Sequence, residues 1–298
     1  MRLGTNLSFS VKRWVEPESW ARVVRNDLGL DLVQFTFDLV DPWWPQELRS
    51  SLAARIRKAA ADQGLELHSA FVGLAHYTYN QLLHPLEEGR RAAVQWYKNA
   101  IDFTAELEVR AMGGPVGALS ADEAQDAELV RSRYASLLDN LAELSEYARM
   151  RGLEALLIEP TPLEREFPWT IEMARKMQSD LAGRTAVPIQ WCLDWGHAIY
   201  EPLYGEKAKD TMSWLTGLAD HMGLIHLQQS DGQLDCHWGF DREEGIVDPG
   251  RVVSEIRRAG LDRLPVFLET FFPFEWTDEQ VMSAMKKSFA VLKPVFAA

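Results

Sequence analysis

The chain has 298 residues, of which 47% are hydrophobic, and its formal net charge at pH 7 is −13. A chain of this length buries a large core, and its acidity disfavours a nucleic-acid partner, because like charges repel the phosphate backbone. No segment has the apolar length of a membrane span, the N-terminus lacks an apolar signal run, and Cys192 and Cys236 form no disulfide framework. We therefore predict a cytoplasmic protein without a membrane partner.

Short apolar runs alternate with amphipathic stretches along the whole chain. The runs predict strands at residues 3–9, 32–37, 65–71, 109–112, 155–159, 189–194, 224–228 and 266–270. The stretches predict helices at residues 17–28, 45–63, 86–107, 121–150, 169–179, 207–220, 249–259 and 278–292. Ser120 with Glu123 resembles a capping box, and Gly64, Gly152 and Gly260 lie where helix C-caps belong.

Eight strand–helix pairs in succession, with no linker between them, favour a closed parallel barrel. One (β/α)₈ TIM barrel takes ~250 residues, so we predict a single domain over residues 1–298. A doubly wound sheet would carry a glycine-rich phosphate loop after its first strand, and residues 3–10 lack one.

The last four predicted strands each deliver an ionisable residue at or near the carboxyl end. These residues are Glu159, Asp194, His226 and Glu269. In a barrel of this type, the chemistry lies at that end of the strands. Taken singly, each carboxylate is explained by a helix cap or a loop charge, and the histidine by a satisfied position in the core. Their occurrence on four successive strands favours a metal site, and this ligand set suits Mn²⁺, Mg²⁺ or Co²⁺ better than structural zinc.

The sequence resembles the xylose isomerase-like TIM-barrel family of sugar and sugar-phosphate isomerases and epimerases over nearly its whole length. The most specific match is Asp194-Trp-Gly-His197, which corresponds to the family's Asp-x-x-His after strand six, and residues 245–248 look like its Gly-x-Ile-Asp segment. The resemblance implies that His197 binds a substrate oxygen. It also implies a divalent metal bound by Glu159, Asp194, His226 and Glu269.

Within the family, residues 228–232 followed by His237-Trp238 most resemble the tetrulose-phosphate 3-epimerases. Ketohexose 3-epimerases carry an arginine soon after the strand-seven histidine, and Asp231-Gly232 supplies none. The resemblance implies a metal-dependent isomerase or epimerase of carbohydrate metabolism that acts on a small ketose or ketose phosphate. His237 and Trp238 would contact that substrate.

Epimerising an α-hydroxyketone removes a proton from the carbon beside the carbonyl. A metal supports this step as a Lewis acid, and we expect Glu159 and Glu269 to exchange the proton as base and acid. A substrate phosphate needs donors, for which we choose Lys12 and Arg13 after the first strand, with backbone amides near residues 113–114. A solvated loop charge explains Lys12 and Arg13 equally well. Aromatic residues after several strands either wall the pocket or form a homo-oligomer interface.

Three other functions compete with this interpretation. A metal-dependent decarboxylase of a 3-oxo sugar acid would use the same ligands, because loss of CO₂ from a β-keto acid also passes through an enediolate. A phosphodiesterase like the AP endonucleases of this fold is disfavoured, because residues 111–114 supply no histidine and the chain is acidic. A barrel that binds sugar without catalysis is disfavoured by the four intact candidate ligands.

Overall fold

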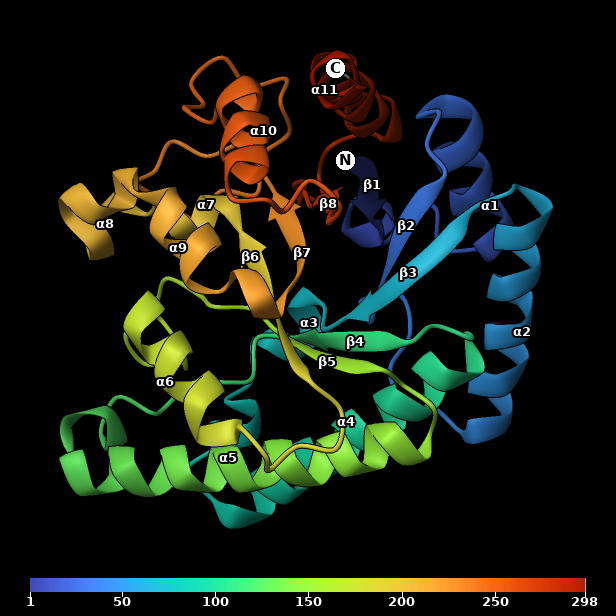
Figure 1. The fold of residues 1–298 in the computed structure, drawn as a ribbon. Helices are drawn as coiled ribbons and strands as arrows, with labels where there is room; N and C mark the ends of the chain where they lie inside the picture. The colour runs from blue at the N-terminus through green and yellow to red at the C-terminus, as the bar shows by residue number, and fades with distance from the viewer. Residues whose placement is uncertain (298) are drawn as a thin grey trace. The chain divides into compact units, whose positions relative to one another are not determined.

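A computed structural model gives the fold and describes residues 1–297. Eight parallel strands follow one another in chain order around a closed barrel (Figure 1). They are β1 (Arg2–Asn6), β2 (Leu32–Thr36), β3 (Glu66–Phe71), β4 (Ala111–Gly114), β5 (Ala155–Ile158), β6 (Ile189–Asp194), β7 (Met222–Leu227) and β8 (Pro265–Leu268). The predicted (β/α)₈ barrel is confirmed.

Helices lie between the strands, and each long one carries a buried apolar face. The α-helices are α1 (Pro17–Arg22), α2 (Gln46–Asp62), α3 (Leu74–Tyr77), α4 (Glu87–Glu106), α5 (Ala127–Met150), α6 (Ile171–Leu181), α7 (Trp195–Ala198), α8 (Glu201–Tyr204), α9 (Thr211–Gly217), α10 (Pro249–Arg258) and α11 (Asp278–Ala297). Short 3₁₀ or π turns are η1 (Leu7–Ser10), η2 (Val23–Asp27), η3 (Gln81–Leu83), η4 (Glu123–Gln125), η5 (Gly205–Lys209) and η6 (Ala219–His221).

Side-chain caps move several element boundaries away from the predicted ones. The first strand ends at Asn6 rather than at residue 9, because the Asn6 side chain accepts a hydrogen bond from the Ser8 amide and starts η1. The hydroxyl of Ser120 accepts from the amide of Glu123, the first residue of η4, whereas α5 begins after its N-cap Asp126. The helix predicted at residues 207–220 is divided into η5, α9 and η6.

Glycines satisfy two kinds of backbone demand. Gly64, Gly152 and Gly260 have φ of 64°, 86° and 73°, so the predicted helix C-caps are confirmed. In β4, a Cβ on Gly113 would lie 1.8 Å from the carbonyl oxygen of Leu157. The close pairing of β4 with β5 therefore requires a residue without a side chain at position 113. The backbone amides of residues 113 and 114, which we predicted as phosphate donors, both belong to β4.

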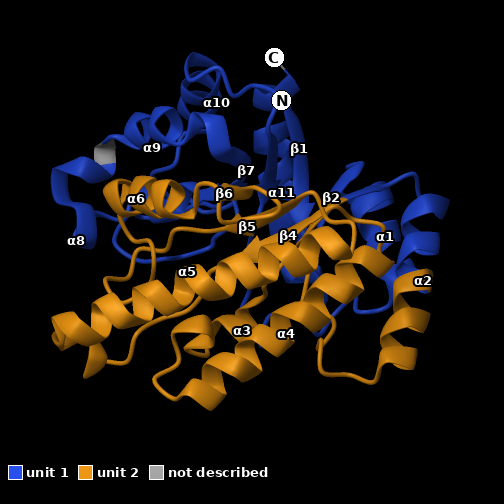
Figure 2. Cartoon of the chain, turned by 60° about the horizontal axis from the view of Figure 1, so that its bottom comes forward, with its two compact units in different colours: residues 1–35, 55–67, 192–298 blue, residues 36–54, 68–191 orange. Residues whose placement is uncertain are grey.

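The chain divides into two compact units (Figure 2). Unit 1 comprises residues 1–35, 55–67 and 192–298, and its strands β7, β8, β1 and β2 pair in that order. Inside it, α10 contacts α9 and α11, and α11 also contacts β1. Carboxyl ends of these strands carry most of the predicted site residues. That residues 1–298 form one domain stays a prediction.

Unit 2 comprises residues 36–54 and 68–191, and pairs β3, β4, β5 and the start of β6. Its long helices α4 and α5 contact each other, and the Tyr147 hydroxyl donates to Asp102 at 2.9 Å across that contact. Its core is rich in aromatic rings, including Phe37 packed edge-on against Trp96 and Phe103. Unit 2 contains Glu159 directly after β5.

Candidate metal centre

Three potential metal ligands meet inside unit 1 at the carboxyl ends of consecutive strands. Asp194 is the last residue of β6, His226 the penultimate residue of β7, and Glu269 the first residue after β8. All three are buried, and their candidate ligand atoms lie within 4.8 Å of one another. The structure thus brings together three of the four predicted ligands within one unit.

The orientation of His226 is fixed by a partner on β2. Its Nε2 lies 2.6 Å from the side-chain oxygen of Gln34, and its Nδ1 lies 2.9 Å from Oε2 of Glu269. Amide and carboxylate oxygens both only accept hydrogen bonds, so Nε2 donates to Gln34 and Nδ1 donates to Glu269, and a bound metal would take the place of the Nδ1 proton. Metal-ligating histidines are typically held this way, with the second ring nitrogen donating to a protein oxygen.

Glu269 is held by Asn6 at the end of β1. The Asn6 amide nitrogen donates to Glu269 Oε1 at 3.0 Å and to the Gln34 oxygen at 2.7 Å. Burial by itself would raise the pKa of Glu269, but the adjacent His226 and its hydrogen bond outweigh burial and lower it. Sequence analysis missed Asn6 and Gln34. The available signal was an amide side chain on each of the first two strands.

Asp194 has one satisfied oxygen and one unsatisfied oxygen. Its Oδ1 accepts from the His197 amide at 2.9 Å and from Gln228 Nε2 at 3.0 Å. Its Oδ2 is buried and has no hydrogen-bond partner among the described residues. A buried carboxylate oxygen without a donor is costly unless a cation meets it, so the donor set of unit 1 fits a divalent metal.

A second group of polar side chains lies on α7 and on the loop after β7. Candidate ligand atoms of Asp194, His197 and His237 also lie within 4.8 Å of one another. Both histidines face Asp235, each with its Nε2 3.2 Å from a carboxylate oxygen. Burial alone would raise the pKa of Asp235, yet the charges of His237 and His197 hold it well below its usual range.

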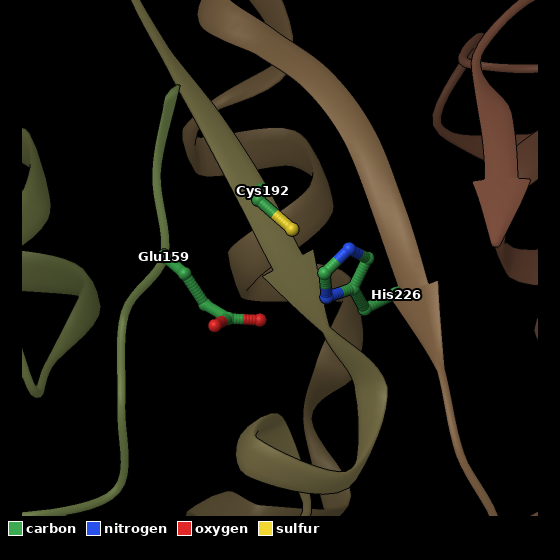
Figure 3. Close-up of side chains that lie close together, drawn as sticks. All are labelled: Glu159, Cys192 and His226. Atoms are coloured by element: carbon green, nitrogen blue, oxygen red, sulfur yellow. The ribbon is translucent and has the colours of Figure 1, made fainter. Parts of the chain in front are cut away.

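Glu159 belongs to unit 2 and follows β5. Its side chain is 4% exposed, and its amide donates to the carbonyl of Gly114 at 3.3 Å. Figure 3 draws Glu159 on the segment after β5, together with Cys192 on β6 and His226 on β7. Cys192 is buried.

The two predicted phosphate-binding residues lie in the loop after β1 and contact the loop after β8. Lys12 Nζ lies 4.1 Å from the centroid of the Phe274 ring. The Arg13 guanidinium donates to the carbonyls of Pro273 and Trp276 at 3.0 and 2.9 Å, and its side chain is only 5% exposed. Arg13 therefore ties the two loops together, and a phosphate-binding role for either residue stays a prediction.

Trp238 forms part of the same rim of unit 1. Its backbone pairs with that of Gln229 through two hydrogen bonds, which close the loop after β7. The Arg242 guanidinium stacks between the rings of Trp238 and Trp276, 5.6 and 5.4 Å from their centroids. Arg242 is a cation that sequence analysis missed, because it lies sixteen residues beyond His226 in the chain. Among residues 1–297, no helix is both long and apolar enough to cross a membrane.

Comparison with known proteins places the chain among sugar-converting barrels. A protein from Rhodospirillum rubrum, provisionally described as a xylose isomerase, is 43% identical, with a TM-score of 0.96 and 99% of each chain covered. The curated D-erythrulose 1-phosphate 3-epimerase of Brucella abortus is 24% identical over 99% of this chain and 96% of the relative. A D-psicose 3-epimerase from Clostridium cellulolyticum, solved with D-tagatose, is 12% identical with a TM-score of 0.74 and 99% coverage of each chain, which shows a shared fold.

The family match extends through most of the barrel, from residue 24 to residue 288. It includes all four predicted metal ligands as well as His197 and His237. The buried Asp, His and Glu clusters are candidate metal sites, and the protein is an enzyme of the sugar isomerase and epimerase class. The chain belongs to the xylose isomerase-like TIM barrel family.

Proposed function

We propose that this enzyme is a divalent-metal-dependent 3-epimerase of a small ketose phosphate, with a tetrulose phosphate as its preferred substrate. The observation that carries the proposal is the strand-end cluster of Asp194, His226 and Glu269, with the buried, unpartnered oxygen of Asp194. The substrate class is supported by the full-length similarity to a D-erythrulose 1-phosphate 3-epimerase.

Four residues of the chain would hold the metal. Asp194, His226 and Glu269 supply the ligand atoms of unit 1, and Glu159 is proposed as the fourth ligand. This assignment is supported by the strand order, because β5 precedes β6 in the barrel and the carboxyl ends of parallel strands share one rim. Carboxylate oxygens with one imidazole suit Mn²⁺, Mg²⁺ or Co²⁺. When bound, such an ion would polarise the ketose carbonyl as a Lewis acid and favour the enediolate.

The proton is moved by the chain's own carboxylates. Glu159 and Glu269 are proposed to act as base and acid on opposite sides of the substrate carbon, each through an oxygen that the metal does not use. The Asn6 hydrogen bond to Glu269 Oε1 fixes the plane of that carboxylate and so directs the basic oxygen. Water is kept away by the burial of the strand ends.

The remaining contacts orient the sugar. His197 and His237 are proposed to hydrogen-bond substrate oxygens, and Trp238 to contact the substrate at the rim. Lys12 and Arg13 are proposed to meet the phosphate, since Lys12 lies on the rim loop after β1. A few local cations are sufficient for this at short range, despite the net charge of −13.

One incubation tests the reaction class. The Mn²⁺-loaded enzyme is mixed with D- or L-erythrulose phosphate in D₂O, and carbon-bound deuterium and the epimer ratio are followed by NMR. We expect deuterium at C3 and the appearance of the opposite epimer from either side. Absence of exchange with any small ketose phosphate, combined with CO₂ release from a 3-oxo sugar acid, would replace the epimerase by the decarboxylase. Parallel incubations with Mg²⁺ and Co²⁺ identify the metal.

A further inference from the structure

Asp235, on the loop between β7 and α10, is the common partner of three nitrogen donors. Its Oδ2 lies 3.2 Å from His197 Nε2, and its Oδ1 lies 3.2 Å from His237 Nε2. Gln228 Nε2 donates to the same Oδ1 at 2.9 Å. A carboxylate only accepts hydrogen bonds, so the two histidines must each present a protonated Nε2 to it.

This arrangement determines which nitrogen His237 offers to the interior of the site. Its Nδ1 is buried, has no hydrogen-bond partner among the described residues, and lies 3.8 Å from Oε2 of Glu269. The ring packs edge-on against Phe271, with centroids 4.9 Å apart, and its backbone amide donates to Gln228. Packing against Phe271 therefore sets the position of the ring, and Asp235 sets which ring nitrogen faces the site.

We propose that Asp235 is a positioning residue of the epimerase site, which fixes the orientation of His237 so that its Nδ1 meets a substrate hydroxyl beside Glu269. The proposal rests on the function proposed above, because it needs a polyhydroxylated substrate at this rim. Physically, it is the arrangement of an acidic side chain behind an imidazole, in which the carboxylate selects the ring nitrogen that faces the substrate.

Asp231, four residues earlier in the same loop, provides the matched contrast. Its Oδ1 accepts from the backbone amides of Gln233 and Leu234 at 2.8 and 3.0 Å, so it shapes the turn and contacts neither histidine. If Asp235 only shaped the loop, the two aspartates would be equivalent. If Asp235 acts through His237, substitutions of the two aspartates will differ in turnover and in the hydrogen bond of His237 Nε2–H.

The kinetic test compares Asp235→Asn with Asp231→Asn, alone and combined with His237→Gln. We expect Asp235→Asn to lower kcat by about 10–100-fold while KM changes only a few fold, because a displaced His237 ring would misalign the substrate carbon relative to Glu269. Asp231→Asn should change kcat by less than about threefold, as expected of a residue that contacts neither histidine. In the His237→Gln background, Asp235→Asn should add little further loss, since residues acting as one unit are non-additive. Multiplicative losses, or equal effects of the two aspartates, would overturn the proposal.

A second measurement does not depend on turnover. The His237 Nε2–H of the Mg²⁺-loaded protein is followed by ¹⁵N NMR, where we expect a hydrogen-bonded Nε2–H in the wild type and in Asp231→Asn. In Asp235→Asn the signal of this hydrogen bond should be weakened or lost, and an unchanged signal would overturn the proposal whatever the substrate is. Metal content is measured alongside it, and loss of one bound ion in Asp235→Asn would make Asp235 a metal ligand instead. Loss of the hydrogen bond in a protein that epimerises no ketose would refute the proposed function separately.

Discussion

Two half-buried histidines, one in each unit, have opposite electrostatic environments. In unit 1, burial alone would lower the pKa of His237, but the charge and hydrogen bond of Asp235, with Asp194 and Glu269, raise it to about 9. In unit 2, burial lowers the pKa of His76 to about 4, and no carboxylate among residues 1–297 opposes this effect. The His76 ring instead stacks on Trp96, with centroids 3.6 Å apart and planes 3° from parallel.

The difference teaches how one residue type serves two purposes. A histidine surrounded by carboxylates has a polar ring, held in a defined orientation, that can hydrogen-bond a substrate. A histidine stacked on an indole contributes mainly apolar packing. Unit 1 collects acids and amides at its strand ends, and unit 2 collects aromatic rings around α3 and α4. Substitutions of charged groups in unit 1 should therefore alter activity, and substitution of His76 should alter mainly stability.

The largest effect is expected from the proposed proton carriers. Glu159→Gln and Glu269→Gln keep an oxygen for the metal but cannot accept a proton, so kcat should fall by at least ~10²–10⁴-fold. Circular dichroism should show an intact fold in both. Glu275→Gln, on the exposed part of the loop after β8, is the control and should retain activity. Near-normal turnover in either site variant would remove that residue from the proton-transfer step.

Metal should stabilise the protein through the acids of unit 1. At a metal concentration 100 times its Kd, linkage contributes about 2.7 kcal/mol to the free energy of unfolding, because the ion binds the folded site. Thermal denaturation with and without Mn²⁺ measures the increase in Tm. Asp194→Asn should diminish this increase, since it alters a buried ligand. An equal increase in wild type and variant would place the metal elsewhere.

Substitutions of Lys12 and Arg13 can distinguish binding of a substrate phosphate from anchoring of the loop after β1. Changing Lys12 and Arg13 together to Ala should raise KM for the phosphorylated ketose about 10–100-fold more than for its unphosphorylated analogue, since a charge-assisted hydrogen bond contributes roughly 1.5–3 kcal/mol. Lys12→Ala alone should carry much of this effect, whereas Arg13→Ala should also lower Tm, because Arg13 holds two backbone carbonyls. Lys58→Ala, in an exposed ion pair with Asp62, is the control. Equal KM values for both sugars would favour an unphosphorylated substrate.

The smallest effects are expected in the pH dependence of stability of the metal-free protein. A raised folded-state pKa stabilises at low pH, so the contribution of His237 should be lost as pH rises from about 6.5 to 9. A lowered folded-state pKa stabilises the protein at high pH instead. Protonation of His76 should therefore lower the free energy of unfolding as the pH drops from about 6.5 to 4. Each slope is at most about 1.4 kcal/mol per pH unit.

Substitution of each histidine tests which one produces which slope. His237→Asn should flatten the alkaline side and His76→Asn the acid side in denaturant titrations repeated across pH. His221→Asn, exposed in η6, controls for the loss of an imidazole as such. If His76→Asn flattened the alkaline side, or abolished turnover, the contrast between the two units would be wrong.

Prediction from sequence succeeded for features that follow from a repeated pattern, such as the number of strands. It was less accurate for the bounds of elements, where a single capping side chain determines the first or last residue. Eight alternations of apolar runs with amphipathic stretches are enough to predict the barrel. The predicted end of β1 was wrong because the cap at Asn6 is a local hydrogen bond. The predicted start of α5 was wrong because the side chain of Asp126 accepts from the amides of Glu128 and Leu129 and starts the helix there. Both involve residues that favour caps and turns in general, so composition alone does not choose between neighbouring candidates.

By itself, the sequence determined the barrel and the acidic and imidazole groups at its strand ends, because parallel strands of a barrel direct their carboxyl ends to the same rim. The tertiary structure alone decided how those groups are oriented. Gln34 lies 192 residues from His226, and the carbonyls that bind Arg13 lie 260 and 263 residues away from it. Hydrogen bonds between such distant segments follow from packing, and a periodic pattern contains no information about them.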